Sequence, residues 1–167
     1  MTTPETHPAS DHRTLTGLKD AREAIDQVIA CATRELAVFD DRLELRGYES
    51  PGRIGALRKL LLAGRMHRIR IALHEPEGLA RTQPRLIALL REFPSAIEIH
   101  RTVGEALNAR DPFVIADDHS AWHLLHQDHP RSVVALHSPP DVHGLVHRFA
   151  EIWELTEPAV SATTLGL

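Results

Sequence analysis

The chain has 167 residues, of which 43% are hydrophobic and 25% are charged, and its net charge is −4 with neutral histidines. These values fit one globular domain with a buried core, and the negative charge argues against non-specific binding to DNA. The single cysteine, Cys31, excludes an intramolecular disulfide and a cysteine-based zinc cluster. Without a signal-peptide pattern or an apolar run near the ~20 residues of a membrane helix, we expect a soluble, cytoplasmic protein.

The start of the chain predicts a tail followed by a helix and a strand. Residues 1–15 are rich in Thr, Pro, His, Ser and Asp without periodicity, which predicts a disordered N-terminal tail. From Leu18 to Ala32 apolar residues recur every three or four positions, the pattern of an amphipathic helix. The short apolar run at 35–41 is bounded by acids and predicts a buried strand.

Helical and strand patterns then alternate. Ser50 and Pro51 have the pattern of an N-cap and a first helical residue, and Gly64 suits the end of that helix. Strict alternation in HRIRIALH, residues 67–74, places Arg68 and Arg70 on one face of a strand. Further strands are predicted at 96–100, 113–118 and 132–137, and further helices at 84–93 and 140–155.

This order predicts the α/β class, with a mixed, mainly parallel sheet flanked by helices. Alternating helices and strands build βαβ units, and the later cluster of strands predicts a β-hairpin that extends the sheet. We find no internal repeat and expect one domain over residues 16–158, followed by a C-terminal tail over 159–167.

Three features together resemble one half of a phospholipase D-like domain over about residues 18–158. They are the element order, the strand FVIADD (113–118) with its hairpin, and the closing helix HGLVHRFAEIWE (143–154). In that family the equivalent strand carries the motif His-x-Lys-x-x-x-x-Asp. The resemblance implies that two motifs, from two halves or two subunits, meet to cleave a phosphodiester.

The family motif is missing here. With Asp117 in the position of the motif aspartate, Pro112 takes the lysine position and Arg110 the histidine position. None of the twelve histidines has a lysine two residues later. Proline cannot hold a phosphate charge and arginine is no nucleophile. The sequence therefore predicts no catalysis of the phospholipase D type.

Four histidines follow this strand, at positions 119, 123, 126 and 129. In a helix, His119, His123 and His126 would share one face and could bind a metal. In a strand, His123 and His126 point to opposite faces. Polar turn residues after FVIADD favour a hairpin, so we expect neither a metal nor another cofactor. These three histidines remain the alternative metal ligands, and the pair His143 and His147 is interpreted as solvated because it lacks the glutamate of HExxH.

The end of the FVIADD strand is also a candidate binding site. Open α/β sheets usually bind ligands at the carboxyl ends of their strands. Arg110, Asp117, Asp118 and His119 could therefore line a relic cleft, although the two aspartates could equally form an Asx turn.

These observations favour a non-catalytic binding or scaffold module that dimerises or docks a protein partner. Domains of this kind without the motif are sometimes joined to acetyltransferase domains, so the resemblance implies such a domain as one partner. One alternative is a metal- or histidine-assisted phosphoester hydrolase that uses the cluster His119–His129. Another is a nucleic-acid backbone binder that uses the basic residues between Arg53 and Arg70, which we consider unlikely because no aromatic residues are interleaved with them.

Overall fold

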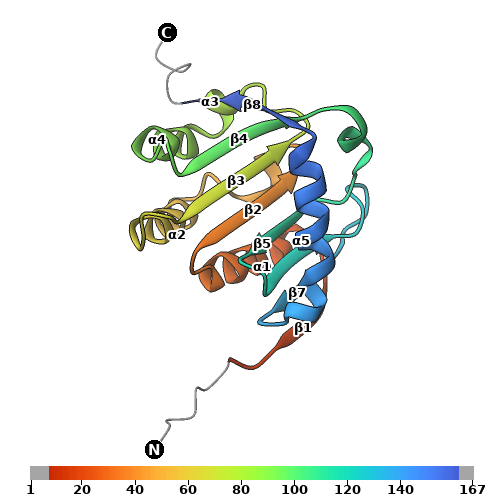
Figure 1. Cartoon of the computed structure of the whole chain (residues 1–167). Coiled ribbons are helices and arrows are strands. Elements are labelled where there is room, and N and C mark those ends of the chain that lie inside the picture. The colour runs from red at the N-terminus through yellow and green to blue at the C-terminus, as the bar shows by residue number, and fades with distance from the viewer. Residues whose placement is uncertain (1–7, 162–167) are drawn as a thin grey trace, which may run out of the picture.

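The computed structural model describes residues 8–161, which form an eight-stranded mixed sheet with helices on both faces (Figure 1). The strand order is β1-β7-β6-β5-β2-β3-β4-β8. The strands are β1 (Asp11–Thr16), β2 (Glu35–Asp40), β3 (Arg68–Leu73), β4 (Ile97–Thr102), β5 (Phe113–Ala116), β6 (Ser120–Leu124), β7 (Arg131–Leu136) and β8 (Thr156–Val160). The helices are α1 (Leu18–Cys31), α2 (Pro51–Leu62), α3 (Leu79–Thr82), α4 (Pro84–Glu92) and α5 (Pro139–Glu154), with 3₁₀ turns η1 (Glu44–Arg46) and η2 (Gly104–Asn108).

Parallel pairing is confined to the middle of the sheet. Strand β3 runs parallel to β2 and to β4, with Leu36 opposite Ile69 and Ile71 opposite Ile99. The other neighbouring strands within residues 8–161 pair antiparallel. The helical connections after β2 and β3 allow parallel pairing, whereas the short turns after β5 and β6 form hairpins. The mixed α/β class is as predicted, but the sheet is not mainly parallel: of the seven pairs of neighbouring strands within residues 8–161, two are parallel and five are antiparallel. Periodicity along one strand does not reveal the direction of its neighbour.

The two edge strands of the sheet extend into segments that were predicted to be tails. Residues 11–16 fall almost entirely within the segment expected to be disordered, yet they form β1, in which Asp11 lies opposite Leu136 of β7. The side chains of β1 are largely exposed, so backbone hydrogen bonds to β7 hold a segment that lacks an apolar pattern. At the other edge β8 reaches Val160 and pairs with β4. Residues 1–7 and 162–167, the ends of the two predicted tails, lie outside the described residues.

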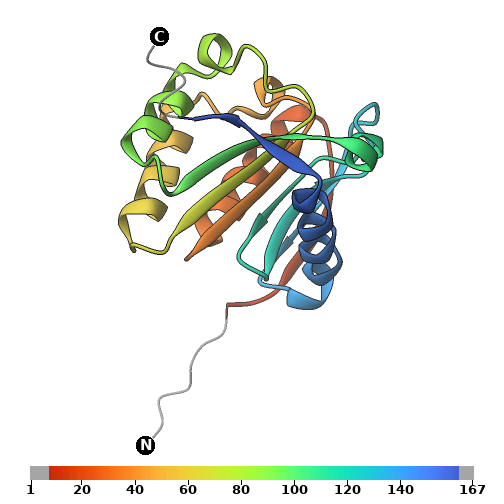
Figure 2. The same ribbon diagram turned by 45° about the horizontal axis from the view of Figure 1, so that its top comes forward.

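Two apolar cores lie on opposite faces of the sheet. Helices α1, α2 and α4 cover one face, where Leu36, Ile69 and Ile71 are buried. Helix α5 covers part of the other face (Figure 2). It packs there on Phe113 and Ile115. The side chains of Arg68 and Glu98 are exposed on the α5 side of β3 and β4, so this part of the sheet is left open. No helix within residues 8–161 is long and apolar enough to cross a membrane.

The hairpin predicted after FVIADD is present as β5 and β6. Val114 lies opposite Trp122, and Ile115 lies opposite Ala121. Trp122 packs in the core under α1, α2 and α4, whereas Ala121 packs in the core under α5. The alternating faces predicted for this strand are therefore confirmed.

A cavity at the amino edge of the parallel strands

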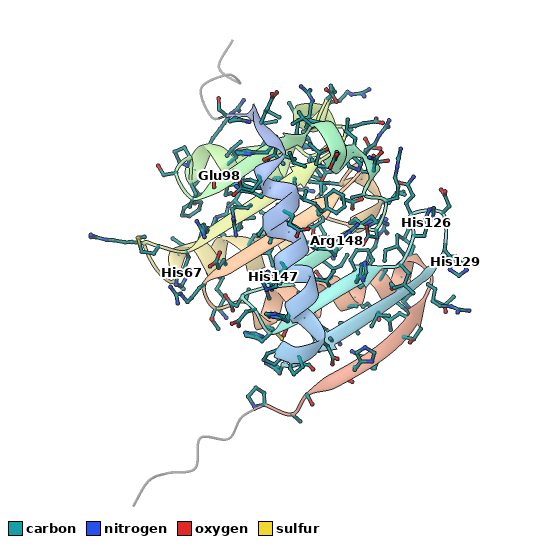
Figure 3. The ribbon with its side chains drawn as sticks, turned by 45° about the vertical axis from the view of Figure 1, so that its right-hand side comes forward. His67, Glu98, His126, His129, His147 and Arg148 are labelled. Carbon is teal, nitrogen blue, oxygen red and sulfur yellow. The ribbon has the colours of Figure 1, made fainter. Side chains whose placement is uncertain are left out.

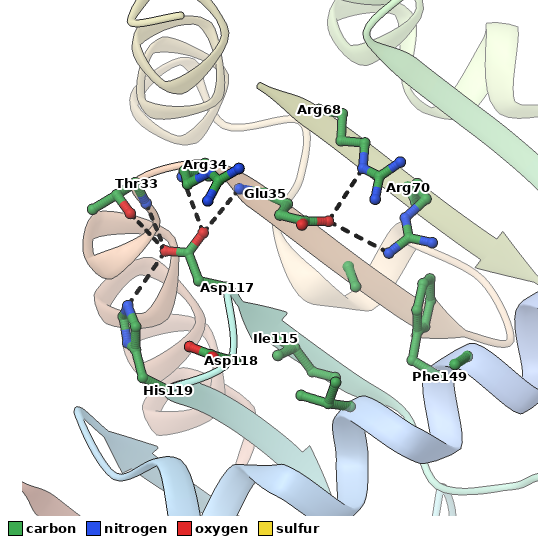
Figure 4. A pocket seen from close by; sticks show the side chains of 13 residues that line it. Thr33, Arg34, Glu35, Arg68, Arg70, Ile115, Asp117, Asp118, His119 and Phe149 are labelled. Carbon is green, nitrogen blue, oxygen red and sulfur yellow. Dashed lines mark hydrogen bonds and ion pairs between the residues drawn. The ribbon is translucent and has the colours of Figure 1, made fainter. Parts of the chain in front are cut away.

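A cavity of about 420 Å³ lies where β2 and β3 begin and β5 ends, with α5 as one wall (Figure 4). Its polar side chains come from the start of β2, from β3 and from the turn after β5. Its apolar side chains come from the sheet and from α5. The residues that line it are Thr33, Arg34, Glu35, Ala37, Arg68, Arg70, Ile115, Asp117, Asp118, His119, Val146, Phe149 and Ala150.

The direction of β5 decides where this cavity lies. Because β5 runs antiparallel to β2, with Ala116 opposite Leu36, the carboxyl end of β5 meets the amino ends of β2 and β3. Asp117 and Asp118 were expected at the carboxyl edge of the sheet, where open α/β folds usually bind ligands. They lie instead at the amino edge of the parallel strands, because the sequence pattern of β5 does not reveal its direction.

Asp117 joins the turn after β5 to the start of β2. Its carboxylate accepts hydrogen bonds from the backbone N–H groups of Thr33, Arg34 and Glu35 at 2.9–3.0 Å, and from the hydroxyl of Thr33 at 3.0 Å. Burial raises the pKa of Asp117, but the hydrogen bonds from Glu35, Thr33 and Arg34 outweigh it and leave the pKa below its ordinary value. Asp117 therefore has a structural role as an anionic cap, held with a positive φ of 53°.

The structure brings together three of the four residues predicted to line a cleft. His119 lies beside Asp117, with Nε2 3.3 Å from a carboxylate oxygen, and its Nδ1 contacts the hydroxyl of Ser120 at 2.8 Å. The side chain of Asp118 is exposed and lines the same cavity. Arg110 precedes β5 and is exposed at the opposite end of that strand, because an extended strand separates residues 110 and 117 by roughly 20 Å.

Arg68 and Arg70, two cations of the cavity, were predicted only for the nucleic-acid alternative and not for the cleft. The carboxylate of Glu35 lies 3.2 Å from Arg68 and 3.5 Å from Arg70. The guanidinium of Arg70 also lies over Phe149, 5.1 Å from the ring centroid, and 5.5 Å from that of Trp153. The alternation of strand 67–74 had placed both arginines on one face, but that pattern alone did not connect them to β5 and α5.

The positive charge of Arg70 is only partly compensated by neighbouring groups of the chain. Its side chain is 22% exposed, and its Nε atom is buried without a hydrogen-bond partner among residues 8–161. Burial and the neighbouring charge of Arg68 lower the pKa of Arg70, while Glu35 and Glu98 act in the opposite sense. Because a buried cation is stabilised by an anion, this part of the cavity is suited to a negatively charged group.

The histidines after β5 do not converge. His119 is in the turn, and His123 lies on β6 with Nε2 2.9 Å from the carboxylate of Asp111. His126 and His129 are exposed in the loop between β6 and β7, away from α5 (Figure 3). Within residues 8–161 no group of three or more His, Cys, Asp or Glu side chains is placed to hold a metal ion.

The basic residues between 53 and 70 do not form one surface. Arg53 is 2% exposed and bonds to Asp26 at 2.8 Å and to the carbonyl of Arg22 at 2.9 Å. Arg58 pairs with Glu92. Arg53 thus ties α2 to α1 and is unavailable to a phosphate backbone.

The carboxyl edge of the parallel strands is closed by internal bonds. Asp40 at the end of β2 is 2% exposed and lies 2.8 Å from Nε of Arg46. His74, after β3, contacts the hydroxyl of Thr102 and places Nε2 2.7 Å from the carbonyl oxygen of Ala109. Asp40 and His74 are therefore satisfied by partners within the chain.

Solved structures with this architecture include phospholipase D family members. Nuc from Salmonella typhimurium, a member of that family, aligns with a TM-score of 0.62 at 13% identity, over 92% of this chain and 100% of its own. NucT from Helicobacter pylori aligns with a TM-score of 0.61 at 10% identity, over 90% and 100%. TrmBL2, an archaeal chromatin protein described with a novel mode of DNA binding, gives 0.65 at 16%, over 89% of this chain and 55% of its own. The molecule therefore has a phospholipase D-like fold.

Within that class, the chain belongs to the family described as a domain of unknown function (DUF7931), whose model matches residues 17–165. The search of curated proteins gives no significant match. At identities of 10–16% the structural matches show the fold alone.

Proposed function

We propose that the chain is a non-catalytic phospholipase D-like binding module that docks a carboxylate of a protein partner in the amino-edge cavity. The observation that carries this proposal is Arg70, a half-buried guanidinium with an unpaired Nε at the wall of an open cavity. Glu35 is shared between Arg70 and Arg68, and its side chain is 40% exposed. An incoming carboxylate can therefore replace Glu35, which then turns to solvent.

The absence of catalysis is the second part of the proposal. The positions that would carry the family's histidine and lysine hold Arg110 and Pro112, and Pro112 is buried with its carbonyl accepting a hydrogen bond from Leu124 at 2.8 Å. We expect no hydrolysis of bis(p-nitrophenyl) phosphate by the purified chain. Turnover that disappears in Arg110→Ala or Asp117→Asn would contradict this part. The separated positions of His119, His123 and His126 give no support to the hydrolase alternative.

The cavity is tested with succinate as a carboxylate probe, by NMR of arginine Nε–Hε signals. We expect saturable shifts at Arg68 and Arg70 that are lost in Arg70→Ala, and tighter binding in Glu35→Gln. Arg58, whose ion pair with Glu92 is exposed, is the internal control. Shifts at Arg70 no larger than those at Arg58 would argue against a carboxylate site.

The source of the carboxylate is a second copy of this chain or another protein, for which the resemblance implies an acetyltransferase domain. Sedimentation velocity of the tag-free chain separates these cases. A dimer that dissociates in Arg70→Ala identifies self-association, for which a stable interface buries on the order of 1,200 Å² or more in total. A monomer at ~100 µM leaves docking of another protein, which pull-down with wild type and Arg70→Ala compares.

A further inference from the structure

Helix α5 carries a pair of histidines that the cavity does not use. His143 and His147 are both exposed, and their Nε2 atoms lie 3.2 Å apart. The two imidazole rings are nearly perpendicular, at 81°, with centroids 4.5 Å apart. Because residues four apart lie on the same side of a helix, the two ring nitrogens face one another above its surface.

We propose that this pair, the α5 clip, binds a late first-row divalent metal ion such as Cu²⁺, Ni²⁺ or Zn²⁺. An imidazole nitrogen lies about 2.0–2.1 Å from Zn²⁺. Two such bonds to one ion place the nitrogens roughly 2.9 Å apart when the nitrogen–metal–nitrogen angle is a right angle. They place them roughly 3.4 Å apart when that angle is tetrahedral. The observed 3.2 Å falls between these values. The clip therefore has the separation of two ligands of one ion.

The surroundings of the clip fit a site with open coordination positions. Its two ligands leave at least two positions for water or for a donor from outside the chain, as in metal sites that exchange ligands. Val146 and Ala150, which line the amino-edge cavity, alternate with the two histidines at positions i+3 and i+7 from His143. Residues at these spacings share one side of a helix, so the clip lies beside the cavity's α5 wall.

Nitrogen ligands also determine which ions the clip selects. Imidazole prefers Zn²⁺, Cu²⁺ and Ni²⁺, whereas Mg²⁺ and Ca²⁺ prefer oxygen. The affinity should follow the Irving–Williams order, with Cu²⁺ bound most tightly. A hydrogen bond between the two rings would use the same geometry, but it needs a proton on one Nε2 atom and therefore competes with metal binding.

The test uses the full chain without an affinity tag. Isothermal titration with Zn²⁺ and electron paramagnetic resonance with Cu²⁺ are compared for wild type, His143→Ala, His147→Ala and their double variant. We expect either single substitution to weaken the tightest site at least tenfold, with no further loss in the double variant, because one imidazole cannot chelate. The matched control is the double variant His126→Ala and His129→Ala, which removes two exposed histidines from a loop and should stay within twofold of wild type.

The outcomes separate the clip from other histidines and from the proposed cavity function. The proposal is supported by a stoichiometry of one ion per chain, or one per two chains if a second clip fills the open positions. In either case the single substitutions His143→Ala and His147→Ala must each remove this tight binding. Affinity within threefold of wild type in the α5 double variant overturns it and leaves only a hydrogen bond between the rings. Circular dichroism without metal checks that α5 is intact, and succinate binding at Arg70 is measured separately, so the two proposals fail independently.

Discussion

The aspartates at the two edges of the parallel strands have pKa values that are shifted in opposite directions. At the carboxyl edge Asp40 is buried against Arg46, and burial raises its pKa to about 6 although the guanidinium opposes this shift. At the amino edge burial also raises the pKa of Asp117, but hydrogen bonds from backbone N–H groups and from the Thr33 hydroxyl outweigh it and leave this pKa below its ordinary value. A strand-end acid therefore does not by itself mark a binding edge. The carboxyl edge is closed by partners within the chain, whereas the amino edge leaves Arg70 facing a cavity.

The largest expected effect is at the closed edge. Arg46→Met leaves the carboxylate of Asp40 buried without its ion pair, which should destabilise the fold by about 3–5 kcal/mol in urea unfolding. The additional substitution Asp40→Asn should recover part of that loss because it removes the unpaired charge. Arg58→Met, at an exposed pair, is the control and should change stability by less than ~1 kcal/mol. A loss as small for Arg46→Met as for this control would show that the edge is not closed by the buried pair.

The second prediction concerns pH. Because the pKa of Asp40 is about 6 in the folded state and 3.8 in the reference state, the folded chain binds more protons between these values. The stability that Asp40 contributes in its protonated form is therefore fully present below about pH 4. It is lost as the pH rises to about 6, by up to ~1.4 kcal/mol per pH unit. Asp117 acts in the opposite sense, since its lowered pKa gives stability that is lost as the pH falls through that pKa. Unfolding free energies of wild type and Asp40→Asn across this range should diverge, and parallel curves would contradict the raised pKa.

The third prediction tests the cap at the amino edge. Asp117→Asn keeps the side-chain shape and tolerates the positive φ, but replaces a carboxylate oxygen by an amide that faces N–H donors. We expect a loss of about 2 kcal/mol in thermal or urea unfolding. Asp118→Asn, in the exposed neighbour, should be near neutral. Equal losses of stability in the two variants would contradict a structural role for Asp117.

The smallest effect is expected at the cavity itself. Glu35→Gln removes the carboxylate near Arg68 and Arg70, but Glu35 and Arg68 are 40% and 50% exposed, so stability should change by less than ~1 kcal/mol. The same variant should bind succinate more tightly, which separates its effect on binding from its effect on folding. A loss above ~2 kcal/mol would show that this ion pair is structural, as at the carboxyl edge.

The sequence pattern predicted most helices and strands because the periodicity of each lies within one continuous stretch of residues. The spacing of apolar residues located α1, α2, α4 and α5, alternation located β3, and the polar turn residues after FVIADD located the β5–β6 hairpin. It did not locate β1, whose exposed side chains carry no apolar pattern and whose partner lies more than a hundred residues away in β7. The burial of Arg53 was likewise invisible, because its partners come from α1 and from the turn before α2.

The sequence by itself determined the α/β class and the common face of Arg68 and Arg70, and it shows that no histidine is followed two residues later by a lysine. Tertiary structure decided that β5 runs antiparallel beside β2, which places Asp117 at the amino edge and Arg110 far from it. It also decided that α5 covers Arg70 in part and brings Phe149 beneath it. The physical reason is that side-chain periodicity is local, whereas strand order, strand direction and burial depend on pairing between distant segments.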